Sequence, residues 1–266
     1  MQKYRQAFLL GIQNAMEYRA NFLLSMVSAL VPIFIQFFLW TTIYHGDQSL
    51  VINGYSYFQI ITYTIMASII TRLNRTGFEY DINDDIKNGG LNKYLVKPVD
   101  YFSYRLSCFI GQKLIHTLLM LIMIVGVFIL LATRFDAPLT VTRIAFFFIS
   151  LILAFILNFM LFFSVAMSGF WLFEIGFLFE AIRIIIIMLS GGIFPLDIFG
   201  EKAAVILNYL PFKYTINFPV ELLNGRVNPG TEYQGLIIQI VWILIFTLIA
   251  KMLWAAGNKR YVAVGG

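Results

Sequence analysis

Long apolar stretches recur along the chain and are separated by short polar segments. An uninterrupted apolar run of about 18 residues or more is typical of a helix that crosses a lipid bilayer. The pattern therefore predicts an all-α integral membrane protein, a single transmembrane domain over residues 1–266. We expect six transmembrane helices, at about 21–44, 55–73, 106–133, 143–170, 175–194 and 236–254, with a tight turn at 171–174.

The first 20 residues have a different pattern. Phe8, Ile12 and Ala15 recur at helical spacing among charged residues, and no small-residue cleavage site follows a clean apolar core. This is typical of an amphipathic helix in the headgroup layer and not of a signal peptide.

Composition and charge narrow the class of protein. The chain is 60% hydrophobic and only 12% charged, about half the charge of an ordinary soluble domain, and its mean hydropathy is +0.81. These values exclude a soluble enzyme and a disordered chain, and the single cysteine, Cys108, cannot form an internal disulfide. The net charge of +5 is explained by Lys and Arg residues that set the topology of a membrane protein and are attracted to anionic lipid. We therefore do not expect nucleic acid as a partner.

The distribution of Lys and Arg predicts the orientation. With the N-terminus inside, twelve basic residues lie in cytoplasmic segments and five outside, and the loop 72–105 alone holds six. The positive-inside rule then places both termini in the cytoplasm. We expect a multi-pass protein of a bacterial cytoplasmic membrane.

The inner loop 72–105 contains a short amphipathic segment. Phe78, Ile82 and Ile86 lie four residues apart on one helical stripe, and four carboxylates occupy the other faces: Glu79, Asp81, Asp84 and Asp85. Such a helix fits a protein partner, because an anionic leaflet would repel the carboxylates. The alternative is an ordinary solvated connector.

The outer segment 190–231 is too long and too apolar for a simple link. Gly191, Gly192 and Pro195 interrupt the end of the fifth predicted span, and the apolar run 203–210 is too short to cross. Two interpretations remain open. The segment is either a re-entrant or interfacial helical hairpin that lines or caps a pathway, or a structural lid.

Few polar side chains lie within the spans. Glu180 and Arg183 are three residues apart on one helix face, and each costs roughly 3 kcal/mol at the bilayer centre, so we expect them to face protein. They form either a pathway or gate, or, as we favour, an internal neutralising pair. Asn158 and Ser164 can bond neighbouring helices.

The sequence motifs of enzymes and nucleotide-binding proteins are missing. The chain contains no phosphate-binding loop, serine-nucleophile elbow or His-Glu-x-x-His motif, and its two histidines, His45 and His116, lie far apart. We therefore expect neither catalytic residues nor a bound metal. An integral membrane enzyme built on Glu180, Arg183 and His116 remains an alternative, as does a passive channel or scaffold.

The order of these segments resembles the permease subunits of type-2 ATP-binding-cassette (ABC) transporters, in the branch that exports drugs, viologens and antimicrobial peptides. The resemblance covers nearly the whole chain and rests on four segments: Glu17-Tyr18-Arg19-Ala20-Asn21-Phe22, the inner loop from Asn88-Gly89-Gly90 to Lys97-Pro98, Gly192-Ile193-Phe194-Pro195-Leu196-Asp197-Ile198-Phe199, and Leu210-Pro211-Phe212-Lys213-Tyr214 followed by Pro219 and Asn224-Gly225.

This resemblance implies several properties. Residues 1–20 would be an elbow helix and 78–87 a coupling helix seated on a separate ABC ATPase subunit, which would bind the ATP and Mg²⁺ while this chain carries no cofactor. Two permeases, identical or homologous, would pair with two ATPases and move an amphiphilic compound outward by alternating access. The predicted ATPase contacts are Phe78, Glu79, Ile82, Asp85 and Ile86. The predicted pathway or gate residues are Glu180, Arg183, Asn158 and Phe194.

Overall fold

Helices form almost all of the fold. The computed structural model describes residues 2–17, 19–45, 47, 49–134, 140–172, 175–228 and 230–261. The elements in chain order are α1 (Gln2–Glu17), α2 (Arg19–Ile43), β1 (Val51–Ile52), β2 (Tyr55–Ser56), α3 (Tyr57–Asn74), α4 (Phe78–Lys87), α5 (Asn92–Leu95), α6 (Tyr101–Arg134), α7 (Val141–Ala166), η1 (Met167–Phe170), α8 (Gly176–Leu189), η2 (Leu196–Phe199), α9 (Glu201–Tyr209), η3 (Phe212–Thr215), α10 (Asn217–Asn224) and α11 (Glu232–Asn258). The predicted all-α class is confirmed, apart from the short antiparallel β1–β2 hairpin.

Three segments of the described chain are long and apolar enough to cross a membrane: Tyr101–Gly126, Val141–Phe170 and Glu232–Asn258. They correspond to the third, fourth and sixth predicted spans. Helices α2 and α3 lie where the first and second spans are predicted, but neither is among these three segments. The full set of six spans therefore stays a prediction. The turn predicted at 171–174 lies partly outside the described residues.

The predicted fifth span is wrong in extent. Helix α8 has 14 residues and ends at Leu189 instead of continuing to residue 194. At 1.5 Å per residue it is about 21 Å long, which is shorter than the roughly 30 Å hydrocarbon core. The chain turns at Ser190, and helix does not resume before Leu196.

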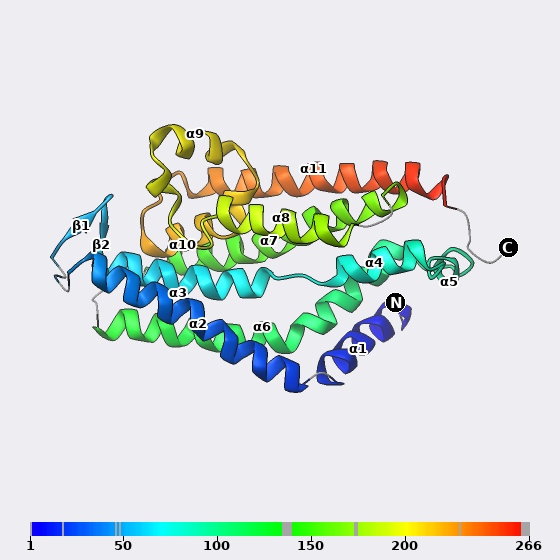
Figure 1. Cartoon of the computed structure of the whole chain (residues 1–266), viewed down its shortest axis with the longest axis horizontal. Helices are drawn as coiled ribbons and strands as arrows, with labels where there is room; N and C mark the ends of the chain where they lie inside the picture. The colour runs from blue at the N-terminus through cyan, green and yellow to red at the C-terminus, as the bar shows by residue number, and fades with distance from the viewer. Residues whose placement is uncertain are drawn as a thin grey trace.

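The long helices run along one axis of the molecule (Figure 1). Helices α4 and α5 lie at one end, together with the start of α1 and the end of α11; we call this the α4 end. The β1–β2 hairpin, α9 and α10 lie toward the opposite end, which we call the α10 end. The start of α1 and the end of α11 thus lie on the same side of the fold, and the identity of that side stays a prediction.

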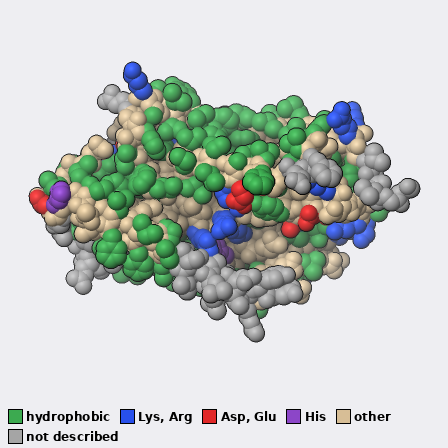
Figure 2. Space-filling model, viewed as in Figure 1, with side chains coloured by type: hydrophobic (Ala, Val, Ile, Leu, Met, Phe, Trp, Pro, Cys, Tyr) green, Lys and Arg blue, Asp and Glu red, His purple; other side chains and the backbone are tan. Residues whose placement is uncertain are grey.

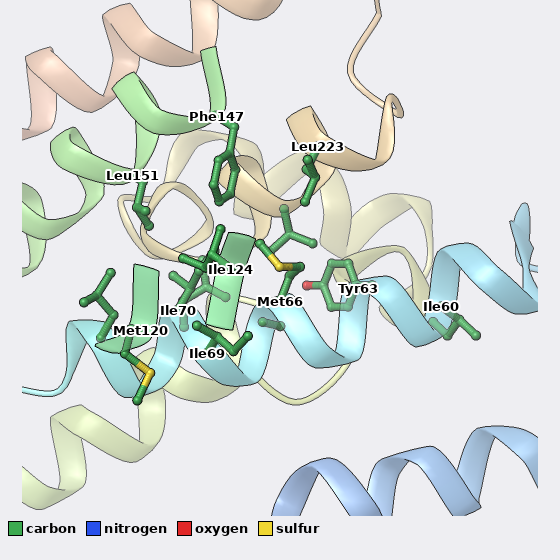
Figure 3. Packing of buried hydrophobic residues seen from close by; sticks show 14 of the residues in the cluster. Ile60, Tyr63, Met66, Ile69, Ile70, Met120, Ile124, Phe147, Leu151 and Leu223 are labelled. Atoms are coloured by element: carbon green, nitrogen blue, oxygen red, sulfur yellow. The ribbon is translucent and has the colours of Figure 1, made fainter. Parts of the chain in front are cut away.

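The interior consists of a large cluster toward each end, with a smaller one between α7, α10 and α11. Toward the α10 end, α3 packs against α6, α7 and α10 through a mainly apolar interface (Figure 3). Its members include Tyr63, Met66, Ile70, Ile124 and Phe147, all at most 1% exposed. The cluster at the α4 end is rich in phenylalanine and is described with the site below. Helices α6 and α7 contribute to both of these clusters and so connect the ends.

Helix α1 is packed directly against α6. Gly11 and Gly111 face each other in this seam: a Cβ atom on Gly11 would lie 2.2 Å from the carbonyl oxygen of Cys108, and one on Gly111 would lie 2.1 Å from that of Phe8. Lys3 also donates a hydrogen bond of 3.1 Å to the carbonyl of Pro98. A helix in this segment is confirmed, and it packs on protein along this seam. Its place in the headgroup layer as an elbow helix stays a prediction.

Short helices fill the segment between α8 and α11, as its sequence predicted. Helix α9 covers most of the apolar run 203–210. Helix α10 is buried from Asn217 to Leu223 and packs against α3 and α7. The Asn217 N–H donates to the Ser190 carbonyl at 2.9 Å, and the Tyr63 hydroxyl donates to that of Gly191 at 2.7 Å. The re-entrant path through a bilayer stays a prediction.

Candidate functional site

Helix α4 is a short helix whose local sequence defines both of its ends. Glu79 and Asp81 lie in the first turn and Lys87 in the last, which complements the partial charges at the helix termini. Gly89 follows the helix with φ of +74°, a left-handed conformation that favours glycine. These features explain why 78–87 folds as an independent helix between α3 and α6.

The apolar stripe of α4 packs into its own chain. Phe78, Ile82 and Ile86 are 3%, 0% and 7% exposed, and their neighbours come from α6, α7, η1 and α8. The ring of Phe78 lies 4.9 Å from that of Phe109 and 4.5 Å from that of Phe159 between centroids. The stripe is therefore an internal anchor for α4.

This burial corrects the residue set expected to touch an ATPase. Glu79 and Asp85 are also buried, at 0% and 6% exposed, so none of the five predicted contacts presents a free surface in this chain. The amphipathic pattern was interpreted correctly as a helix that buries one face, but the covering surface belongs to the same polypeptide. The outward face of α4 carries Asp81 and Asp84 instead.

A buried ion pair joins α4 to α8. Arg183 of α8 places Nη2 against Oε1 of Glu79 and Nη1 3.1 Å from Oε1 of Glu180. Tyr80 of α4 donates a hydrogen bond of 2.5 Å from its hydroxyl to the same Glu180 oxygen. Burial raises the pKa of the Glu79 carboxyl, and the nearby Arg183 charge opposes that rise. The Glu180–Arg183 contact expected from sequence is confirmed, but the Glu180 side chain is 53% exposed, so the expectation that both residues face protein is wrong for Glu180. Glu79 is an additional partner of Arg183 that the sequence did not indicate.

A second set of polar contacts joins α4 to the start of α6. Arg105 of α6 pairs with the Asp85 carboxylate and places Nη1 3.4 Å from Oδ2 of Asp81. Its Nη2 also donates to the Asp81 carbonyl at 3.0 Å, and the Tyr101 hydroxyl donates to Asp85 at 2.8 Å. Charged groups on two sides of α4 are thus paired with different helices, so displacing α4 acts on both α6 and α8.

The remaining predicted pathway residues, Asn158 and Phe194, have contacts with other elements. The Asn158 side chain donates to the carbonyl of Asn74 at the end of α3, where it serves as an interhelical bond. Ser164 likewise donates to the carbonyl of Phe246 in α11 at 2.9 Å. Phe194 packs against Trp40, with 6.2 Å between ring centroids, in the cluster toward the α10 end. A pathway or gate lined by Glu180, Arg183, Asn158 and Phe194 stays a prediction.

A polar cluster at the α10 end was not predicted. The Tyr55 hydroxyl lies 2.8 Å from Oε1 of Glu221 and 2.9 Å from Oδ2 of Asp197. Arg226 forms ion pairs of 3.1 Å with both carboxylates, and its guanidinium lies 3.6 Å above the Tyr55 ring. Burial, together with the Asp197 charge, raises the pKa of Glu221 to about 7. The only sequence signal was a carboxylate inside the apolar run 216–223.

One comparison with known proteins bears on identity. A family model described as ABC-2 family transporter protein matches residues 30–265, which is most of the chain. The match begins within α2 and includes α4 and every element that contacts it. A search of curated proteins finds no match.

Proposed function

The chain belongs to the ABC-2 transporter family, and from this premise we propose that it is the permease subunit of an ATP-driven exporter in a bacterial cytoplasmic membrane. Membership makes it the membrane component of a transporter rather than a catalytic chain. The α4 end, with both termini, faces the cytoplasm in this proposal. Two such permeases assemble with two ABC ATPase subunits, which bind the ATP and Mg²⁺, and together they move an amphiphilic drug, an antimicrobial peptide or a lipid-like compound outward.

The observation that carries the proposal is the way α4 is attached. Its apolar stripe and its ion pairs connect it to α6, α7 and α8 at once. A helix held in this way moves as a rigid body with its neighbours, so a force applied to its outer face reaches helices that run the length of the fold. This is the property that a coupling element between an ATPase and a membrane pathway requires.

The exposed face of α4 is the surface that we assign to the ATPase. Asp81 and Asp84 are exposed there. An ATPase groove with positive charge would complement these carboxylates, which steers association and fixes its register. This surface replaces the buried stripe as the proposed contact.

Transport follows from alternating access. Closure of the ATPases displaces α4 and shifts the helices attached to it between inward-open and outward-open arrangements. A substrate changes ATP turnover only as far as its affinity for the two arrangements differs. Drug-stimulated hydrolysis is therefore the activity expected of the assembled complex, and transport that persists in ATP-depleted vesicles would favour a passive channel.

Charge reversal on the outer face of α4 tests the proposal. We expect Asp84→Lys, at an exposed position, to leave the permease folded but to remove the ATPase that co-purifies with the tagged wild-type chain from native membranes. Asp47→Lys, an exposed change near the opposite end, is the matched control and should keep the ATPase. The readouts are a phosphate-loop protein in the eluate, identified by mass spectrometry, and drug-stimulated hydrolysis.

Two results would contradict the assignment. In one, no phosphate-loop protein accompanies the wild-type chain. In the other, Asp84→Lys and Asp47→Lys retain the ATPase equally, which would place the contact elsewhere on the chain.

A further inference from the structure

Four polar side chains meet at the α10 end, and each comes from a different segment. Tyr55 belongs to β2, Asp197 to η2 and Glu221 to α10, and Arg226 follows α10. The Arg226 guanidinium also donates a hydrogen bond to the Gly54 carbonyl in the hairpin. Figure 2 shows hydrophobic side chains over much of the surface toward this end. The fold therefore brings these polar groups together from distant parts of the sequence, in largely apolar surroundings.

The Tyr55 hydroxyl bridges two carboxyl groups. Its oxygen lies 2.8 Å from Oε1 of Glu221 and 2.9 Å from Oδ2 of Asp197, both within hydrogen-bonding distance. A hydroxyl has one hydrogen, so it donates to only one of these two oxygens. An ionised carboxylate only accepts hydrogen bonds, and the second contact therefore needs a proton on one carboxyl. With that proton, one carboxyl donates to the Tyr55 oxygen while the Tyr55 hydroxyl donates to the other.

Burial decides which carboxyl holds the proton. The Glu221 side chain is 11% exposed and that of Asp197 is 48% exposed, and Arg226 pairs with both at 3.1 Å. A charge is more costly on the more buried group. Burial, together with the Asp197 charge, raises the pKa of Glu221 to about 7. The proton therefore resides on Glu221, and the four side chains are then neutral overall.

The other titratable groups near Glu221 come from the elements that pack against α10. Tyr63 of α3 donates its hydroxyl hydrogen to a backbone carbonyl at 2.7 Å. Arg143 of α7 lies beside Gly225, just after the end of α10. Lys213 of η3 acts on Glu221 through its charge and favours the ionised form, which keeps the proton removable near neutral pH.

Loss of the proton removes one of the two hydrogen bonds. Two carboxylates then compete for a single hydroxyl hydrogen and repel each other. Asp197 is the more exposed of the two, so water can replace its contact with Tyr55, and its partly exposed ion pair with Arg226 holds it only weakly. Arg226 still connects Glu221 to the hairpin. The element released is therefore η2, which contains Asp197.

We propose that Glu221, Tyr55 and Asp197 form a proton-operated latch, in which one shared proton holds η2 against the hairpin and α10. The proton leaves by a relay: Glu221 gives its proton to the Tyr55 oxygen as the Tyr55 hydroxyl proton passes to Asp197, which releases it to water. Tyr55 is neutral before and after the transfer, so no charge is left on its buried side chain. The latch depends on these contacts alone, and not on the ATPase or on which side of the membrane this end faces.

Amide hydrogen exchange of the full chain in phosphatidylcholine nanodiscs tests the latch. Peptides that cover η2 are compared at about pH 5.5 and about pH 8.5, on either side of the Glu221 pKa of about 7, after correction for the chemical exchange rate. We expect the protection of η2 to fall about tenfold at the higher pH, the effect of losing one hydrogen bond to a charged group.

Two amide variants supply the missing hydrogen without a proton. In Glu221→Gln the new amide donates to the Tyr55 oxygen, and in Asp197→Asn it does so from the other side. Both variants should keep η2 protected at both pH values, whereas Tyr55→Phe, which removes the bridge, should lower protection at both. Asp47→Asn removes the same charge at an exposed position near this end and should behave as the wild type does.

Two results would overturn the latch. One is equal protection of wild-type η2 at the two pH values. The other is a pH dependence in the amide variants as large as that of the wild type. If one amide variant fails to fold, as its unfolding temperature would show, the other decides. Loss of the ATPase partner alone would affect the proposed function and leave this result intact.

Discussion

Replacing Arg183 with glutamine tests whether the ion pair between α4 and α8 holds α4 in place. Glu79 is fully buried and the Arg183 side chain is 13% exposed, so solvent hardly screens the pair. Removing one partner of a buried pair leaves an uncompensated charge and typically costs about 3–5 kcal/mol. We expect a loss of this size in Arg183→Gln, and a smaller loss in Glu79→Gln because Arg183 keeps Glu180 at 3.1 Å.

The double variant Glu79→Gln with Arg183→Gln provides the control. It removes both charges, so it should be less destabilised than the sum of the single variants. Denaturant unfolding in detergent micelles gives the three free energies, and limited proteolysis in the link 75–77 reports release of α4. Additive costs within about 0.5 kcal/mol, or an Arg183→Gln cost below about 1 kcal/mol, would refute the reasoning.

The pH dependence of the same variant follows from the Glu79 carboxyl. Its pKa is raised in the folded state, and loss of Arg183 raises it further. A folded state that holds its proton more tightly than the unfolded chain is favoured at low pH and loses that advantage as the pH rises through the folded pKa. Arg183→Gln should therefore regain stability on acidification, whereas the double variant should not.

Three further changes test other parts of the fold. Gly111→Val should displace α1, since even a Cβ atom would lie 2.1 Å from the Phe8 carbonyl oxygen, and faster proteolysis within α1 should accompany a loss of about 1–3 kcal/mol. Unchanged protection of α1 would contradict the seam. Phe78→Ala should cost about 3–5 kcal/mol in unfolding experiments, because its ring lies in the buried cluster and not at a partner surface. For Glu221, the pKa is raised from 4.5 to about 7, so stability should fall by about 3 kcal/mol between those pH values, and Glu221→Gln should flatten the profile. A wild-type profile that rises over this interval would contradict the assignment.

The long helices could be predicted because their signal is local. Length and uninterrupted hydropathy are sufficient to identify α6, α7 and α11, and the four-residue spacing of Phe78, Ile82 and Ile86 is sufficient for α4. The extent of α8 was overestimated because Ile193 and Phe194 are apolar and were included in the span. The helix ends before them, at Leu189, and Gly191 follows with a positive φ.

The site was harder to predict because its contacts are distant in sequence. Amphipathicity shows that one face of α4 is covered, but it carries no information on whether the same chain or a partner covers it. Glu79 and Arg183 are 104 residues apart, and Tyr55 and Glu221 are 166 apart, so no spacing rule connects them. Glu180 and Arg183 were predicted as a pair because they lie on one turn of a single helix.

The glycine seam between α1 and α6 has a mechanical consequence. No side chain separates the two backbones at Gly11 and Gly111, so α1 must follow every tilt of α6, and Arg105 fastens the start of α6 to α4. A bilayer that becomes thicker, thinner or more compressed laterally would reorient this rigid unit as a whole. If α4 contacts an ATPase as proposed, the physical state of the surrounding lipid would change the orientation of α4 toward that partner, and with it the rate of transport.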